Sequence, residues 1–183
     1  IDHAAWQCAQ WQQQGWCIQV AVNVPVTVIL EPRFVDHLRS VLARHPTRNG
    51  LIFEITESLF LSDYDRLSVL LNQIRSLGIG FSIDDFGTGH SSLSRLRRLP
   101  VSELKIDRSF VMDMEKCRDD LTIVESTIQL AHNLGLLVVA EGVESEAALQ
   151  HLTRLGCDLV QGFHLGRPMP PEEVVSFVRQ SPW

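Results

Sequence analysis

Six short apolar segments recur along the chain, and helical stretches separate most of them. They cover residues 17–24, 51–57, 79–85, 102–107, 136–142 and 158–163. In most of these segments the apolar residues run together and do not alternate with polar ones, a pattern that predicts parallel strands in a sheet covered on both faces. Glycine closes three helical stretches, at positions 78, 135 and 156, where it suits a left-handed helix cap. The alternation of strands and helices predicts either a doubly wound sheet or a (β/α) barrel.

Every predicted strand carries a polar side chain near its carboxyl end. In chain order these residues are Asn23, Glu54, Asp84, Lys105, Glu141 and Gln161. In a barrel the carboxyl ends converge on one mouth, where active sites are built, whereas distant strands of an open sheet would have no reason to contribute. The pattern therefore favours a TIM-like (β/α) barrel. A complete barrel has eight strands and typically about 250 residues, so these 183 residues predict about six of the eight.

A barrel that lacks two strands has open sheet edges, and such edges invite pairing with another chain. We therefore expect the 183 residues by themselves to be dimeric, strand-swapped or poorly soluble. The chain opens with Ile1, inside a predicted helix. We expect further residues upstream of it, which would supply the two remaining strands.

The strand-end residues form an oxygen-rich set, with carboxylates at Glu54, Asp84, Asp85 and Glu141 and amides at Asn23 and Gln161. Hard divalent cations such as Mg²⁺ and Mn²⁺ prefer such ligands. A second cation would explain why Asp84 and Asp85 are adjacent, and two cations roughly 3.5 to 4 Å apart form the usual clamp for displacement at phosphorus. Lys105 would add a fixed positive charge or orient the attacking water.

Each of these residues, considered alone, also has a purely structural interpretation. Asp84 and Asp85 are compatible with turn and capping residues before Gly87. Glu54 is compatible with a surface salt bridge, and Lys105 with a side chain that extends from a strand edge into water. Their joint placement at the ends of successive strands favours the metal site.

Composition excludes several other classes of protein. A formal net charge of −6 argues against a DNA or RNA partner, because phosphate backbones attract basic faces. The four cysteines show no C-x-x-C spacing, so we expect reduced thiols and no structural zinc site. No apolar run approaches the roughly 20 residues that span a bilayer. We expect a cytoplasmic domain.

Six sequence segments, in this order and at this spacing, carry a family resemblance: VAVNV (20–24), FEITES (53–58), DDFGTGHSSL (84–93), LKIDRSF (104–110), VVAEGVE (138–144) and QGFHLGRPMP (161–170). Together they resemble the EAL domain family of bacterial cyclic di-GMP phosphodiesterases over essentially the whole chain. The resemblance implies a modified TIM-like barrel in which one strand is antiparallel. It also implies that residues 1–183 are an EAL domain without its N-terminal part, because the E-x-L-x-R segment of the family would lie upstream of residue 1.

The resemblance also implies roles for individual residues. The metal ligands would be Asn23, Glu54, Asp84, Asp85 and Glu141, and the catalytic group would comprise Lys105, Glu141 and Asp85. Substrate binding or loop support would fall to Glu57, Glu144, Gln161, Gly87 and Ser91. Lys105 would position the hydrolytic water, and Glu57 would anchor the DFGTG loop. The implied cofactors are two Mg²⁺ or Mn²⁺ ions, with Ca²⁺ inhibitory.

The reaction implied is hydrolysis of one phosphodiester bond of cyclic di-GMP, giving linear pGpG, in bacterial second-messenger signalling and biofilm control. The alternative is a catalytically inactive EAL-like receptor or scaffold, but the retained carboxylates and Lys105 favour an enzyme. One departure from the family is Pro25, in place of the usual serine, which removes a hydroxyl and a backbone donor. We expect a homodimer whose full-length protein carries upstream sensory or GGDEF domains. Any membrane anchor of the full-length protein would lie in these upstream segments.

Overall fold

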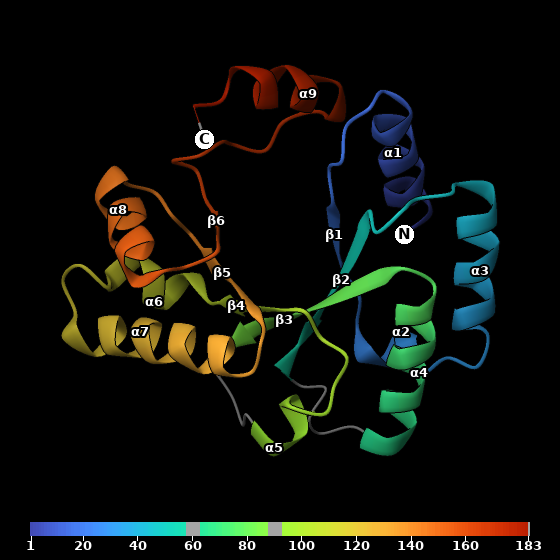
Figure 1. Cartoon of the computed structure of the whole chain (residues 1–183), viewed down its shortest axis with the longest axis horizontal. Helices are drawn as coiled ribbons and strands as arrows, with labels where there is room; N and C mark the ends of the chain where they lie inside the picture. Colours follow the sequence, from blue (N-terminus) through green and yellow to red (C-terminus); the bar gives the residue numbers. More distant parts are fainter. Residues whose placement is uncertain (58–62, 88–92, 183) are drawn as a thin grey trace.

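The structure, a computed structural model, describes residues 1–57, 63–87 and 93–182. Its centre is a six-stranded parallel sheet that curls into a half-barrel, with neighbouring strands in sequence order (Figure 1). The strands are β1 Val20–Asn23, β2 Leu51–Thr56, β3 Ile79–Phe86, β4 Glu103–Ile106, β5 Leu137–Glu141 and β6 Leu159–Gln161. The prediction of six parallel strands of a TIM-like barrel is confirmed, and no antiparallel strand is among these six.

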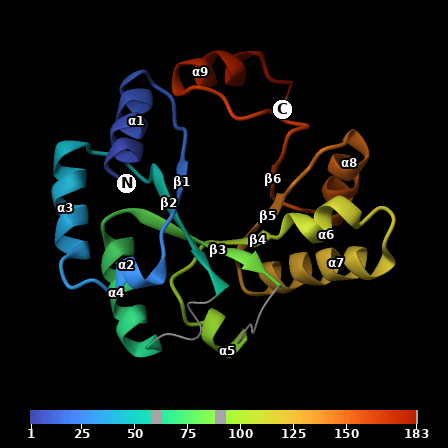
Figure 2. The same cartoon turned by 180° about the vertical axis from the view of Figure 1, so that it is seen from behind.

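Helices connect the strands and lie around the outside of the curled sheet (Figures 1 and 2). They are α1 Asp2–Gln13, α2 Val26–Ile29, α3 Phe34–Arg44, α4 Tyr64–Ser76, α5 Leu93–Leu96, α6 Arg108–Asp113, α7 Arg118–Asn133, α8 Glu146–Leu155 and α9 Pro171–Gln180. The last helix, α9, lies on the side of the molecule between the two edge strands, β1 and β6. The predicted left-handed glycines are observed, with φ of 85° at Gly78, 75° at Gly135 and 79° at Gly156.

The hydrophobic core lies between the outer face of the sheet and the helices. Phe53 of β2 and Phe81 of β3 are fully buried there, with ring centroids 6.1 Å apart. Leu67, Leu71 and Ile74 on one face of α4 are also fully buried. Successive side chains of a strand point to opposite faces. The positions that alternate with these outward apolar residues therefore face the inside of the half-barrel, where the polar strand-end residues lie.

The edge strands are shorter than the sequence predicts. The predicted strands 17–24 and 158–163 correspond to Val20–Asn23 and Leu159–Gln161. Each edge strand pairs on one side only among the strands that the structure describes. An apolar run therefore marks where a strand can form, while the neighbour's hydrogen bonds decide how far it extends. Leu159, on β6, is 45% exposed.

Two further expectations concern the whole chain. All four cysteines are free thiols. Over residues 1–57, 63–87 and 93–182, none of the helices combines the length and the hydropathy that a bilayer-crossing segment requires.

Candidate functional site

The carboxyl ends of four adjacent strands meet at the side chain of Lys105. This lysine, on β4, places its Nζ 2.7 Å from Glu54 Oε1 on β2 and 3.1 Å from Asp84 Oδ1 on β3. The same Nζ lies 2.5 Å from Glu141 Oε1 on β5. Residues separated by up to 87 positions in the sequence (54 to 141) are thus joined through a single ammonium group. This group of one lysine and three carboxylates is called the Lys105 cluster below.

Lys105 is held in its charged form. Only 4% of the residue is exposed to solvent. Burial by itself disfavours the ammonium, but hydrogen bonds and charge from Glu141 and Glu54 outweigh burial and raise the pKa of Lys105. The lysine therefore acts as a fixed positive charge and a hydrogen-bond donor, and it does not serve as a base at neutral pH.

Negative charge is in excess around this lysine. Burial raises the pKa of Glu141, and the neighbouring Asp84 and Glu54 add to that effect, although Lys105 opposes it. Burial also raises the pKa of Glu103, which lies two residues before Lys105 on β4. The negative charge of Glu54 raises this pKa further. One ammonium does not neutralise these carboxylates, so the cluster favours additional cations.

The aspartate doublet lies at an irregularity in the sheet. The pairing of β3 with β4 shifts register between Ile83 and Phe86. Within this bulge Asp85 adopts a left-handed conformation with φ of 56°, and its backbone N–H donates to Asp84 Oδ1 at 3.1 Å. Bulges re-aim side chains next to active sites, and a non-glycine residue at positive φ is strained. Burial, and then Asp84 and Asp107, raise the pKa of Asp85.

The two amide residues flank the Lys105 cluster. Asn23, the last residue of β1, is paired in register with Glu54. Gln161, the last residue of β6, is paired in register with Glu141. Both are exposed, so each places an amide at the rim of the site beside one of the clustered carboxylates.

The remaining predicted residues divide between described and undescribed parts of the chain. Glu57 follows β2 and is 7% exposed, and Glu144 is exposed after β5. Gly87 has φ of 100°, which favours glycine, and an added Cβ there would lie 3.4 Å from the ring of Phe110. Ser91 and the part of the DFGTG loop after Gly87 lie outside the described residues.

One acidic residue at this rim was not predicted from the sequence. Asp107 caps α6 by accepting a hydrogen bond from Ser109 N at 2.9 Å, and it adds negative charge near Asp85. Its position, two residues after Lys105 at the end of a strand, was a signal that could have identified it. The carboxylate of Asp107 therefore both caps α6 and contributes negative charge at the rim.

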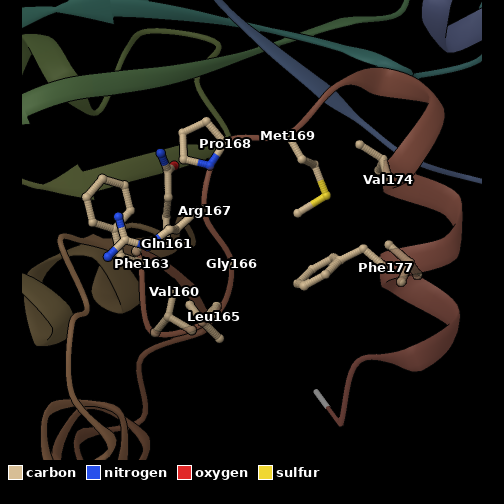
Figure 3. Close-up of a pocket in the computed structure, with 12 residues that line it drawn as sticks. Val160, Gln161, Phe163, Leu165, Gly166, Arg167, Pro168, Met169, Val174 and Phe177 are labelled. Atoms are coloured by element: carbon tan, nitrogen blue, oxygen red, sulfur yellow. The ribbon is translucent and has the colours of Figure 1, made fainter.

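Two hollows lie at this end of the sheet, and one of them borders Glu141 of the Lys105 cluster. The first, of about 610 Å³, is lined by Arg108, Ser109, Met112, Glu141, Gly142, Glu144, Gln161, Gly162 and Phe163. The second, of about 590 Å³, lies between the segment after β6 and α9, and it is more apolar (Figure 3). Gln161 and Phe163 border both hollows. Phe163 is 53% exposed, and the Arg167 guanidinium lies over its ring at 5.0 Å.

The donor set of this rim fits hard divalent cations. Carboxylate oxygens dominate it, amides flank it, and its negative charge exceeds the charge of Lys105. Such oxygen ligands suit Mg²⁺ and Mn²⁺. Within the described ranges, no three His, Cys, Asp or Glu side chains are arranged as a metal-binding group, and the three clustered carboxylates contact Lys105.

The sequence matches the family model described as "EAL domain" over residues 1–168. It is 46% identical over 182 residues to the "Bifunctional diguanylate cyclase/cyclic di-GMP phosphodiesterase MucR" of Pseudomonas aeruginosa, covering 97% of this chain and 26% of that protein. It is 40% identical over 163 residues to the "Cyclic di-GMP phosphodiesterase NbdA" of the same organism, covering 88% and 21%. The chain thus spans about a quarter of the length of these relatives.

Solved structures show the same fold. A structure described as "PaMucR Phosphodiesterase, c-di-GMP complex" matches with a TM-score of 0.89 and 46% identity, covering 94% of this chain and 71% of that one. The "Klebsiella pneumoniae BlrP1" manganese/cy-diGMP complex matches with a TM-score of 0.78 and 32% identity, covering 90% and 43%. The calcium/cy-diGMP complex of the same protein has a TM-score of 0.80 and 31% identity, covering 91% and 42%.

Proposed function

Because the chain belongs to the EAL domain family, we propose that the full-length protein which carries it hydrolyses cyclic di-GMP to linear pGpG, and that the 183 residues alone are inactive. The observation that carries this proposal is the Lys105 cluster, in which one ammonium contacts carboxylates from three neighbouring strands. A structural salt bridge needs only one carboxylate, and crowding three of them around one lysine costs stability. A function at this site explains why the chain keeps such an arrangement. Relatives named as cyclic di-GMP phosphodiesterases support the choice of substrate.

The metal ligands in this proposal are Asn23, Glu54, Asp84, Asp85 and Glu141. We propose two Mg²⁺ or Mn²⁺ ions as cofactors and Ca²⁺ as an inhibitor. Bound to these oxygens, the cations would polarise the scissile phosphate and lower the pKa of water at the site. Relatives solved with manganese or calcium and cyclic di-GMP support the use of divalent cations.

The residues of the chain itself hold and orient the reactants. The Lys105 ammonium has three N–H donors, and in the structure three carboxylates surround them. With these carboxylates engaged by bound cations, the ammonium would donate a hydrogen bond to the attacking water and stabilise negative charge that develops on the phosphoryl oxygens. The oxygen of the water forms the new bond to phosphorus, and the bond from phosphorus to the 3′ oxygen breaks. A carboxylate of the cluster takes the proton of the water, and the 3′ oxygen takes up a proton as it leaves. The product keeps its phosphate at the 5′ end, as pGpG requires.

The hollow of about 610 Å³ beside Glu141 suits a purine base. Phe163 offers an exposed ring for stacking. Arg108 contributes guanidinium donors that match the O6 and N7 acceptors of guanine. We place one guanine of cyclic di-GMP in this hollow, with the adjacent phosphate at the Lys105 cluster.

Three broader proposals accompany the reaction. We propose a cytoplasmic location, a homodimer, and fusion to further signalling domains, such as sensory or GGDEF domains. The greater length of the relatives and the name "Bifunctional diguanylate cyclase/cyclic di-GMP phosphodiesterase" support fusion. The unpaired edges of β1 and β6, within the described sheet, support association with further chain segments.

Product analysis tests the reaction. The protein that carries this chain is incubated with cyclic di-GMP and Mg²⁺ or Mn²⁺, and pGpG is followed by chromatography. We expect turnover that is lost in Asp84→Asn and Lys105→Ala and suppressed by Ca²⁺. Tight binding of cyclic di-GMP by the wild-type protein without any pGpG would instead identify a receptor.

A further inference from the structure

Strand β6 is the least supported strand beside the site. It has three residues, Leu159–Gln161, and none of them is buried. In the described sheet it pairs with β5 alone. Yet its last residue, Gln161, lies in register beside Glu141 of the Lys105 cluster. Contacts outside the strand are therefore important for its placement.

A histidine–carboxylate pair lies at each end of β6. Before the strand, His132 Nε2 at the end of α7 lies 2.9 Å from Asp158 Oδ2, which also accepts from Val138 N at 2.8 Å. After the strand, His164 Nε2 lies 3.1 Å from Glu146 Oε2 at the start of α8. The second pair lies next to Gln161 and Phe163, whereas the first lies at the opposite end of the strand.

The turn that contains His164 crosses the turn after β5. Val143 N donates to Gln161 O at 3.0 Å, and His164 N donates to Val143 O at 3.0 Å. The two main chains touch, because a Cβ added at Gly162 would lie 2.1 Å from Val143 O. Val143 is two residues from Glu141, so a displacement of the turn after β6 also disturbs the strand that carries Glu141.

Helix α8 offers a fixed anchor for this turn. Ser145 caps it by accepting from Ala148 N at 3.0 Å, and Leu152 is fully buried. Glu146 Oε1 accepts from Gln150 Nε2 at 2.8 Å, which orients the carboxylate and leaves Oε2 to His164. Hydrogen bonds from Gln150 and then from His164 lower the pKa of Glu146.

We propose that His164 is a positioning residue which, by bonding Glu146 on α8, holds the turn after β6 so that Gln161 and Phe163 keep their places in the substrate-binding wall beside Glu141. This inference rests on the proposed function. The Lys105 cluster comes from β2 to β5, whereas His164 lies after β6, so loss of the pair weakens substrate binding more than it slows the chemical step.

Kinetics of matched variants in the protein that carries this chain test the role. His164→Leu removes the donor and keeps the bulk, Glu146→Ala removes the acceptor, and His164→Gln keeps an N–H donor at a similar reach. The first two should raise KM for cyclic di-GMP about threefold to fivefold, as expected for a partly exposed pair, with kcat within about twofold. His164→Gln should restore KM, and the double variant His164→Leu/Glu146→Ala should match either single variant.

The control is His132→Leu, which breaks the pair at the opposite end of β6. It should leave KM unchanged. An unchanged KM in His164→Leu, or additive effects of His164→Leu and Glu146→Ala, would overturn the inference. An equal rise of KM in His132→Leu would also overturn it, because any loosening of β6 would then suffice.

Amide hydrogen exchange provides a readout that needs neither substrate nor metal. The Val143 and His164 amides, which join the two turns, should exchange about threefold to fivefold faster in His164→Leu than in wild type, and at the wild-type rate in His132→Leu. Unchanged exchange in His164→Leu would refute the positioning role whatever the activity. If the wild-type protein produced no pGpG, the proposed function would fail, while the exchange rates would still decide the role of His164.

Discussion

Replacing Lys105 by methionine removes the cation of the Lys105 cluster and keeps most of its volume. Three carboxylate oxygens lie 2.5 to 3.1 Å from its Nζ. Two unit charges 4 Å apart attract by about 4 kcal/mol at an effective dielectric of about 20, and the cost of desolvation offsets part of this. Removing one partner of a buried pair typically costs about 3–5 kcal/mol. Because Lys105 is 4% exposed, we expect a loss of that size in K105M at pH 8 without divalent cations.

The free energy of unfolding that K105M loses should be smaller at low pH than at high pH. The pKa of Glu141 is raised in the folded protein, first by burial and then by neighbouring carboxylates. A carboxyl group of this kind stabilises the fold below its ordinary pKa, and that contribution is lost as the pH rises through the folded-state value. Without Lys105 the pKa rises further. The deficit of K105M relative to wild type should therefore be smaller at pH 5 than at pH 8.

Urea unfolding, followed by tryptophan fluorescence, measures this deficit. With an m-value of about 2 kcal/mol/M, the midpoint should fall by about 1.5–2.5 M. Lys116→Met is the control, since Lys116 is exposed, and it should change the free energy of unfolding by less than about 0.5 kcal/mol. K105M/E141Q should recover at least about 1 kcal/mol of the K105M loss, because it removes one uncompensated charge. A free energy of unfolding for K105M within about 1 kcal/mol of wild type at pH 8 would show that Lys105 does not stabilise the carboxylates of the cluster.

Three other predictions address the bulge, the crossing of the turns and the thiols. Asp85→Gly relieves a left-handed conformation and should raise the free energy of unfolding by about 0.5–1 kcal/mol while abolishing pGpG production; a less stable variant would contradict the strain. Gly162→Ala should cost about 1–3 kcal/mol in urea unfolding, whereas Gly80→Ala, with 3.5 Å of room, should cost much less; equal losses would contradict this. Burial raises the pKa of Cys157 to about 11, so about 0.1% is thiolate at pH 8; mass spectrometry should show iodoacetamide modifying exposed Cys17 first, and faster labelling of Cys157 would contradict its burial.

The sequence predicted the fold because parallel strands leave a strong signal. Runs such as 136–140 are continuously apolar, and the glycines that close the helices take the left-handed conformation as expected. The sequence also predicted that residues at strand ends lie on one rim, since parallel strands share their direction. That reasoning identified Glu54, Asp84 and Glu141 as neighbours, and the structure joins all three through Lys105.

Other features depended on contacts that no local pattern encodes. The positive φ of Asp85 arises from a register shift between β3 and β4, which involves two strands at once. Asp107 was not predicted because an aspartate before a helix is fully explained as a helix cap, and it does accept the capping bond from Ser109. The pairing of His164 with Glu146 joins residues 18 apart across a strand and a turn. Such pairs depend on side-chain orientation and not on hydrophobic periodicity.

The strand-end cluster around Lys105 is proposed to hydrolyse a phosphodiester bond of cyclic di-GMP. The most direct measurement is a reaction of the protein that carries this chain with cyclic di-GMP and Mn²⁺ in ¹⁸O-labelled water, analysed by mass spectrometry. We expect pGpG with one ¹⁸O in its 5′-phosphate, and no such product from K105M. Cyclic di-GMP that is bound but recovered intact and unlabelled, or labelled pGpG formed equally fast by K105M, would contradict the proposal.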